Sequence, residues 1–164
     1  MRLTTLAVAV TFAASCVGNA RAQSKTAVGV EGGALSGFYE SLFQLGLRVT
    51  PSRGGYGSAD FAFATIPDYL LHGTLVFLMD LGVTYGAPRD SSPVYVFPHG
   101  GVSMLGGVGL SNGGGGAVVG YNFGAGLLVH ASPRLGVTVD YTYRRISGGE
   151  VALSSLTFGL MFMH

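Results

Sequence analysis

Alternation of apolar and polar residues is the clearest feature of the chain. In LGVTVDYTYR, from Leu135 to Arg144, the apolar side chains occupy the odd positions, with Gly, Thr, Asp and Arg between them. A period of two is typical of a β-strand with one apolar face. Similar stretches recur along the chain and predict eight strands. These are residues 26–33, 39–50, 59–66, 74–85, 94–109, 117–131, 135–144 and 155–162.

Short segments rich in Gly, Pro, Ser and Asp separate the predicted strands. Such connections favour antiparallel neighbours over parallel ones, which need long crossovers. Pro98 predicts a bulge or weak point within 94–109, and no segment has helical periodicity. The pattern therefore predicts an all-β fold, an eight-stranded antiparallel up-and-down β-barrel. The turn segments are 33–37, 51–58, 67–68, 88–93, 111–116, 132–133 and 147–149.

Residues 1–22 form a predicted secretory signal peptide. A basic residue near the start precedes an uncharged apolar stretch, and the small residues Ala20 and Ala22 suit a signal peptidase. Cleavage after Ala22 predicts a mature barrel domain of residues 23–164. The alternative is a lipoprotein signal at Cys16, although Leu is missing three residues before it. Because Cys16 is the single cysteine, the mature domain would have neither disulfides nor a thiolate metal site.

Composition excludes several classes of protein. The 164 residues carry a formal charge of +1, so no basic field is available for nucleic acid. A mean hydropathy of +0.47 with 48% hydrophobic residues is too apolar for a disordered chain. After the signal, however, no uncharged apolar run reaches the roughly 18 residues of a membrane helix. Alternating strands are the usual way to accommodate so much apolar content without such runs.

The composition of the polar strand face indicates whether the apolar side chains point into the barrel or out of it. A soluble lipocalin-like barrel would cover its exterior with Lys and Glu, whereas here the non-apolar positions are mainly Gly, Ser, Thr and Asn. Small residues suit a crowded lumen, which predicts that the apolar side chains point outward. The charged residues fall opposite the large apolar side chains and predict a polar network in the lumen. The predicted lumen residues are Glu31, Glu40, Arg48, Asp80, Asp140 and Arg144.

This predicted lumen has more acids than bases. Four carboxyl groups face two guanidinium groups, so at least one carboxylate should be protonated, hydrated or paired with His72 or His130. By strand position, Glu31 is expected in the outer half of the barrel and Arg48 in the inner half. His99 and His164 are interpreted as isolated rim residues.

Aromatic residues are predicted to mark two girdles at the membrane interfaces, because their rings are apolar and a tyrosine hydroxyl prefers water. With the N-terminus in the periplasm, Tyr39, Tyr121, Tyr141 and Tyr143 would lie towards the outer end. Tyr85, Tyr95 and Phe162 would lie towards the inner end.

The segments YNFGAGLLVHASPRLGVTVDYTYRRIS and LTFGLMFMH carry a family resemblance. A Gly-rich strand, a Ser-Pro turn and a V-x-V-D-Y-x-Y-R strand follow in order, and the chain resembles the small eight-stranded outer-membrane barrels of the OmpA-transmembrane, OmpX and opacity-protein type. The resemblance implies the outer membrane of a Gram-negative-type cell, its lipids as surroundings, and the barrel-assembly machinery as a partner during biogenesis. In that family the last residue is commonly Phe, whereas here Met163 and His164 follow Phe162.

The sequence thus predicts a monomeric outer-membrane barrel with a plugged lumen and a structural, membrane-integrity or surface-interaction role. No cofactor or metal site is expected, because the four His residues lack ligand spacing. One alternative is a lipid-modifying enzyme, an acyltransferase or deacylase, with His72, Asp68 and Ser111 as candidate residues near the outer rim, although their spacing matches no motif. The other is a soluble periplasmic binding barrel of the lipocalin type.

Overall fold

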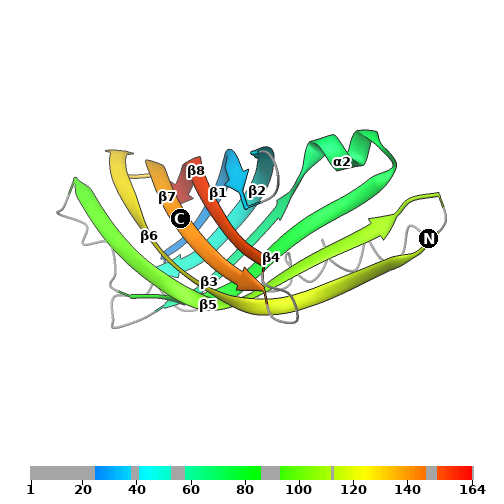
Figure 1. Cartoon of the computed structure of the whole chain (residues 1–164). Helices are drawn as coiled ribbons and strands as arrows, with labels where there is room; N and C mark the ends of the chain where they lie inside the picture. Colours follow the sequence, from blue (N-terminus) through cyan, green and yellow to red (C-terminus); the bar gives the residue numbers. More distant parts are fainter. Residues whose placement is uncertain are drawn as a thin grey trace.

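The fold is a closed antiparallel β-barrel (Figure 1). The computed structural model describes residues 25–37, 41–52, 58–85, 93–111, 113–146 and 151–163, so the predicted signal peptide lies outside the described residues. Strands adjacent in sequence pair with each other, and β8 pairs with β1. This confirms the predicted up-and-down fold. The strands are β1 (Lys25–Ser36), β2 (Leu42–Ser52), β3 (Ser58–Thr65), β4 (Thr74–Thr84), β5 (Val94–Gly109), β6 (Gly115–Ser132), β7 (Leu135–Ile146) and β8 (Val151–Met163).

The strand register measures the stagger of the barrel. Starting at Val28 on β1 and moving each time to the paired residue on the next strand, one reaches Ala152 on β8. The residues passed on the way are Val49, Phe61, Leu81, Val102, Tyr121 and Arg145. Val28 itself pairs with Phe162, ten residues beyond Ala152 on β8, so the shear number is 10. With ordinary strand spacings, this stagger tilts the strands by about 40° from the barrel axis. The interior of such an eight-stranded barrel is just wide enough for side chains to fill.

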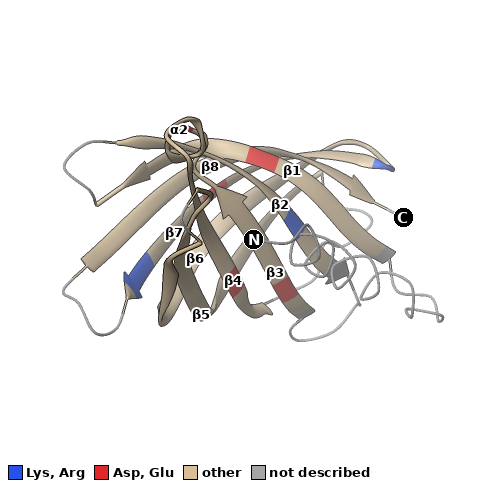
Figure 2. Cartoon of the chain, turned by 90° about the vertical axis from the view of Figure 1, so that its right-hand side faces the viewer, with Lys and Arg blue, Asp and Glu red and all other residues tan. Residues whose placement is uncertain are grey.

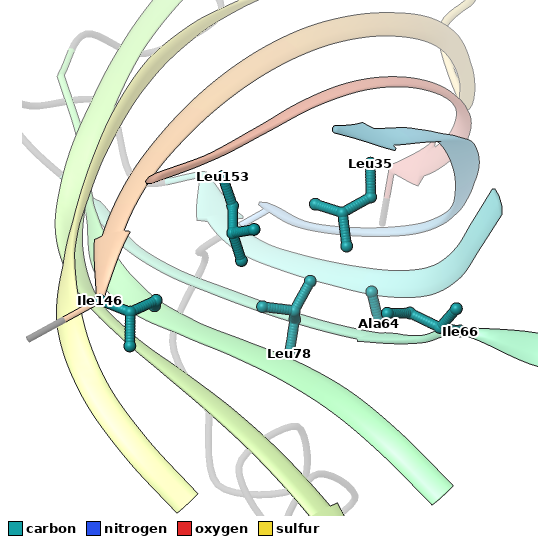
Figure 3. Packing of buried hydrophobic residues seen from close by; sticks show 6 residues of the cluster. All are labelled: Leu35, Ala64, Ile66, Leu78, Ile146 and Leu153. Atoms are coloured by element: carbon teal, nitrogen blue, oxygen red, sulfur yellow. The ribbon is translucent and has the colours of Figure 1, made fainter. Parts of the chain in front are cut away.

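Two apolar clusters fill the two ends of this interior. The end opposite the start of β1 and the end of β8 holds the α2-end cluster, where six buried side chains point towards one another (Figure 3). The other end holds the termini-end cluster, against which Tyr95 and Met163 also pack. The α2-end cluster is Leu35, Ala64, Ile66, Leu78, Ile146 and Leu153. The termini-end cluster is Ala27, Phe97, Leu128 and Met161.

Glycines on β6 make room for large side chains on β5. Gly126 lies directly opposite Phe97, and Gly124 lies directly opposite His99. A Cβ atom at Gly126 would collide with the Phe97 ring, and one at Gly124 would collide with the imidazole of His99. The Gly-rich segment of β6 is therefore the counterpart of two inward-pointing rings on its neighbour.

A short helix and a β-bulge differ from the sequence expectation. The helix, α2 (Pro67–Leu71), follows β3 and has Pro67 in its first turn, where a missing amide hydrogen costs little. Five residues are too few for a helical period to show in the sequence. Within the described residues, no helix has the length and hydropathy needed to cross a membrane. The register shift falls between His130 and Ser132 on β6, and the pairing of β5 with β6 is continuous through Pro98.

Pro98 fits within β5 because Tyr95 supplies a substitute donor. The Tyr85 amide donates to the Pro98 carbonyl at 2.8 Å, so these two residues extend the ladder between β4 and β5. An ordinary residue at 98 would return a hydrogen bond to the Tyr85 carbonyl, which proline cannot do. The Tyr95 hydroxyl donates to that carbonyl instead, at 3.2 Å. The expected weak point is thus compensated by a side chain.

The β5–β6 hairpin extends beyond the other strands at the end that carries α2 (Figure 1). The described pairing between β6 and β7 begins at Gly120 and Ile146, and residues 147–150 lie outside the described part of the chain. Residues 115–119 of β6 pair with β5. Among the described strands, β5 and β6 therefore reach furthest at this end.

We expect Gly126→Val to destabilise the barrel by about 1–3 kcal/mol, because the added methyl groups overpack the site filled by the Phe97 ring. Gly116→Ala is the matched control, since a Cβ atom at Gly116 meets nothing within 4 Å. The free energy of unfolding, measured in urea, checks this prediction. Equal values for the two variants would show that β6 does not need glycine opposite Phe97.

Candidate functional site: the polar layer inside the barrel

A layer of charged and polar side chains lies between the two apolar clusters. Figure 2 shows the charged residues on strands spread around the barrel. The two buried arginines organise this layer into two groups, the Arg48 group and the Arg144 group. The Arg48 group contains Arg48, Glu31, Asp60, Asp140 and His99. The Arg144 group contains Arg144, Asp80, Ser103, Asn122 and Ser155.

Arg144 binds Asp80 through a two-pronged ion pair across the barrel. Its Nε donates to both carboxylate oxygens at 3.1 Å, and its Nη2 donates to Oδ2 at 2.6 Å. The remaining Nη1 donates to the Ser155 hydroxyl at 2.6 Å. A planar guanidinium suits such a paired contact, which fixes both geometry and charge. The interaction joins β7 to β4 and β8.

The Asp80 carboxylate also accepts hydrogen bonds from β5 and β6. The Ser103 hydroxyl donates to Oδ1 at 2.5 Å, and the Asn122 amide donates to the same oxygen at 3.4 Å. Asn122 also donates to Ser103 at 2.9 Å. With Arg144 and Ser155, the Arg144 group links five consecutive strands, from β4 to β8. The buried charges of Asp80 and Arg144 are balanced and well supplied with polar partners.

The Arg48 group places one guanidinium among three carboxylates. Nη1 of Arg48 lies 3.2 Å from Asp140 and 3.7 Å from Glu31, and Nη2 lies 3.4 Å from Asp60. Neither Nε nor Nη1 of Arg48 has a hydrogen-bond partner among the described residues, so its attraction to the acids is mainly a charge interaction. The guanidinium also lies over the Phe97 ring, 5.7 Å from the centroid.

The carboxylates of the Arg48 group outnumber its one guanidinium, and side chains of His and Thr provide them with further polar contacts. His99 Nε2 lies 2.9 Å from Asp140 Oδ2, and the Thr142 hydroxyl donates to Oδ1 at 2.7 Å. The Thr50 hydroxyl donates to Asp60 at 2.7 Å. Because an isolated buried charge is very unfavourable, these contacts allow three acids to lie near one arginine. The Arg48 group links β1, β2, β3, β5 and β7. Its ion pairs and hydrogen bonds therefore hold strands from different sides of the barrel together.

The structure places five of the six sequence-predicted lumen residues in these two groups. The sixth, Glu40, lies outside the described residues. Glu31 and Arg48 form an ion pair at 3.7 Å, although their strand positions suggested opposite halves of the barrel. The tilt of the strands brings them to one level, which a count along each strand ignores.

Sequence reasoning missed two members of the Arg48 group. Asp60 lies near the start of β3 and is buried against Arg48, and its alternation with Phe61 was the available signal. His99 was interpreted as a rim residue, which is wrong, because it is buried beside Asp140. The histidines proposed as carboxylate partners do not take that role. Among the described contacts, His72 Nδ1 bonds to the backbone oxygen of Asp68, and His130 Nε2 has no hydrogen-bond partner.

The predicted interface aromatics divide into outward and inward side chains. Tyr95 is a correction, because it points inward and stacks on Phe97 with centroids 6.1 Å apart. The pleat places Tyr95 on the same face as Phe97 and His99. Tyr39 lies outside the described residues, and Tyr143 is partly buried with its ring against Phe123. The exposed ones are Tyr85, Tyr121, Tyr141 and Phe162.

The candidate enzyme residues do not form a catalytic arrangement among the described contacts. His72 bonds to the Asp68 backbone rather than to its carboxylate, and Ser111 lies in the turn after β5. A hydrolytic triad needs a base held between an acid and a nucleophile. The described geometry provides no such relay at this rim.

We expect Arg144→Met to lower the free energy of unfolding by about 3–5 kcal/mol, because it leaves the buried Asp80 carboxylate without its cation. The double variant Asp80→Leu/Arg144→Met should lose less than the sum of the single changes. Arg145→Met is the control, since Arg145 is exposed on the outer surface of the same strand. Additive single and double effects in urea unfolding would argue against a coupled pair.

Comparison with known proteins supports the fold. No protein-family model matches the chain, and no curated protein matches it. Several solved structures do match. The N-terminal β-barrel domain of Pseudomonas aeruginosa OprF has a TM-score of 0.60 at 13% identity, covering 85% of this chain and 100% of that one.

Two further structures lead to the same conclusion. Neisserial surface protein A has a TM-score of 0.59 at 12% identity, covering 86% of this chain and 97% of that one. A major outer membrane protein from Thermus thermophilus has a TM-score of 0.60 at 14% identity, covering 87% of this chain and 100% of that one. At these identities the likeness is one of fold, and the chain has the fold of the small eight-stranded outer-membrane β-barrels.

Proposed function

We propose that this protein is an outer-membrane β-barrel with a plugged lumen, and that its role is structural or one of surface interaction. The observation that carries this proposal is the division of side chains by the barrel wall. Large apolar side chains cover the outside, whereas ion pairs and apolar clusters fill the inside. The same division argues against a soluble lipocalin-like barrel, which needs its apolar face inward.

The outer surface matches the chemistry of a bilayer. Leu81 is 65% exposed, Val96 62% and Phe158 57%, values that water would strongly disfavour across a whole surface. This apolar band runs from Val129 near the termini end to Val119 near the α2 end. At the strand tilt given above, it is about 25 Å tall, the height of the lipid-facing band of outer-membrane barrels.

Because side chains fill the interior, the barrel is not expected to conduct solutes. Each end is packed by an apolar cluster, and the polar layer between them is bound together by charge. Water and ions would have to displace packed Leu, Ile, Phe and Met side chains to pass. The barrel therefore serves as a stable membrane-embedded body, with its rims available for contacts.

Orientation, export and assembly complete the proposal. A periplasmic N-terminus, after removal of residues 1–22, would place both chain ends in the periplasm and α2 at the cell surface. Phe162 is exposed near the end of β8, where the assembly machinery would read it despite the residues that follow. The protein would act as a monomer, since pairing of β1 with β8 closes the sheet formed by the described strands and leaves no edge strand for another copy to extend.

The first test is migration on a detergent gel of protein from a washed outer-membrane fraction, unheated beside boiled. We expect the protein in that fraction, with a shift between the two bands, because a closed hydrogen-bonded barrel resists detergent until heated. Recovery from the soluble periplasm without a band shift would refute the proposal.

The second test is electrical. We expect the wild-type protein in a planar lipid bilayer to give no steady ion current, because apolar clusters close both ends of the lumen. The variant Phe97→Ala/Leu153→Ala thins both clusters and should conduct, whereas the outward Phe158→Ala should behave as wild type. A steady current through the wild-type protein would show that the lumen is open.

A further inference from the structure

One charged side chain faces outward from the described strands. On β7 the alternation points Arg144 into the lumen and the next residue, Arg145, to the outside, where it is exposed. Every other outward position of the described strands holds an uncharged residue. The outer face of these strands thus has a single charged position, and its charge is positive.

Arg145 lies near the α2 end of the apolar band. Its neighbour on β6 is Tyr121, and the band ends two residues further along β6, at Val119. An arginine that faces lipid is costly at the bilayer midplane, whereas near the membrane interfaces it costs little. The apolar stem of the side chain can lie against the barrel wall while the guanidinium extends towards water. In a bilayer, this guanidinium therefore meets lipid headgroups rather than acyl chains.

Hydroxyl groups surround Arg145 on β6, β7 and β8. Tyr121 lies directly opposite it on β6 and is exposed. On β8, Ser154 lies opposite Tyr143 and is therefore diagonal to Arg145, within the usual reach of a long side chain. The Tyr141 hydroxyl donates to the Ser154 oxygen at 3.2 Å, which leaves the Ser154 hydrogen free to donate to another group. Guanidinium and hydroxyl donors thus occur together on one outward part of the wall.

A phosphate monoester matches this set of donors. It presents three acceptor oxygens and more than one negative charge, and a planar guanidinium binds phosphate through paired hydrogen bonds. Within the described part of the chain, the Arg145 side chain has no hydrogen-bond or ion-pair partner, whereas that of Arg144 is bound inside the lumen. We propose that Arg145, Ser154 and Tyr121 bind the phosphate of an anionic lipid whose headgroup is a phosphate monoester.

The apolar wall beside the site makes the ligand a lipid rather than a soluble phosphate. Towards the middle of the barrel, the outward residues Leu156 and Phe158 follow Ser154 along β8, and both are exposed. These side chains contact the acyl chains of a lipid whose phosphate lies at Arg145, and burial of that apolar surface adds to the charge interaction. The proposal rests on the proposed outer-membrane location and names the class of lipid that the outer face selects.

Photolabelling in vesicles tests the proposal. The probe is phosphatidic acid with a diazirine on one acyl chain close to the glycerol, as a minor component of phosphatidylcholine vesicles that contain the protein. Phosphatidylcholine with the same diazirine is the comparison, because its choline balances the charge of its phosphate. Peptide mass spectrometry measures labelling at residues 119–123 and 152–156, which flank Arg145, and at Phe77 on β4.

Phe77 reports ordinary contact with lipid at the same depth. Three pairing steps lead from Arg145 through Tyr121 and Val102 to Leu81 on β4, and each step descends towards the termini end. Phe77 lies four residues from Leu81 towards the α2 end, which offsets this descent. The ratio of labelling near Arg145 to labelling at Phe77 therefore measures binding at the site and not depth in the bilayer.

We expect this ratio to be about fivefold higher with phosphatidic acid than with phosphatidylcholine, because of the charge-assisted hydrogen bonds from Arg145. Arg145→Gln should remove the difference, and Ser154→Ala should reduce it about twofold through the loss of one neutral hydrogen bond. Arg134→Gln is the matched control, since Arg134 is an exposed arginine in the turn after β6, at the other end of the barrel. Detergent-gel migration verifies that each variant is folded.

Each other outcome overturns a defined statement. Equal ratios for the two lipids in the wild-type protein, with normal labelling of Phe77, refute the phosphate site and leave the membrane location intact. A preference for phosphatidic acid that survives Arg145→Gln means that the anion binds elsewhere, which also refutes the site. Loss of the preference on addition of an equal concentration of glycerol 3-phosphate would show a site for soluble phosphate rather than for lipid. Absence of labelling at both positions refutes the membrane location and the lipid site together.

Discussion

Closure of the sheet with a shear number of 10 is the constraint on which the rest of this structure depends. Pairing of β1 with β8 satisfies the backbone donors and acceptors that an open sheet would leave at its edges. The stagger that permits closure also sets the strand tilt and the width of the interior. Eight strands leave room for side chains and little else, so every inward residue must fit against those from the opposite wall.

The interior meets this constraint by layering. Apolar side chains close both ends, and the charged residues lie between them, where guanidinium groups can reach carboxylates on distant strands. Arg144 binds Asp80 three strands away, and Arg48 does the same with Asp140. Burying these charges is costly unless each finds a partner, so the contacts favour the one register in which all are paired. The glycines of β6 are part of the same packing, because a side chain at either position would collide with Phe97 or His99.

The outer and inner faces of the barrel wall bear on different properties. The apolar outer face suits a lipid environment, and the packed interior argues against transport through the lumen. Fold likeness alone would not distinguish these properties, since unrelated functions share one barrel architecture.

The sequence by itself determined the strands, their antiparallel order and the face that each residue presents, because a period of two reports these directly. It identified Glu31, Arg48, Asp80, Asp140 and Arg144 as inward residues for the same reason. Tertiary structure decided which of them meet, since strand tilt shifts each residue along the barrel axis by an amount that local pattern does not contain. For this reason His99 and Asp60 join Arg48 unforeseen, and Tyr95 lies inside beside Phe97. Helix α2 was also missed, because five residues are too few for a helical period to show in the sequence.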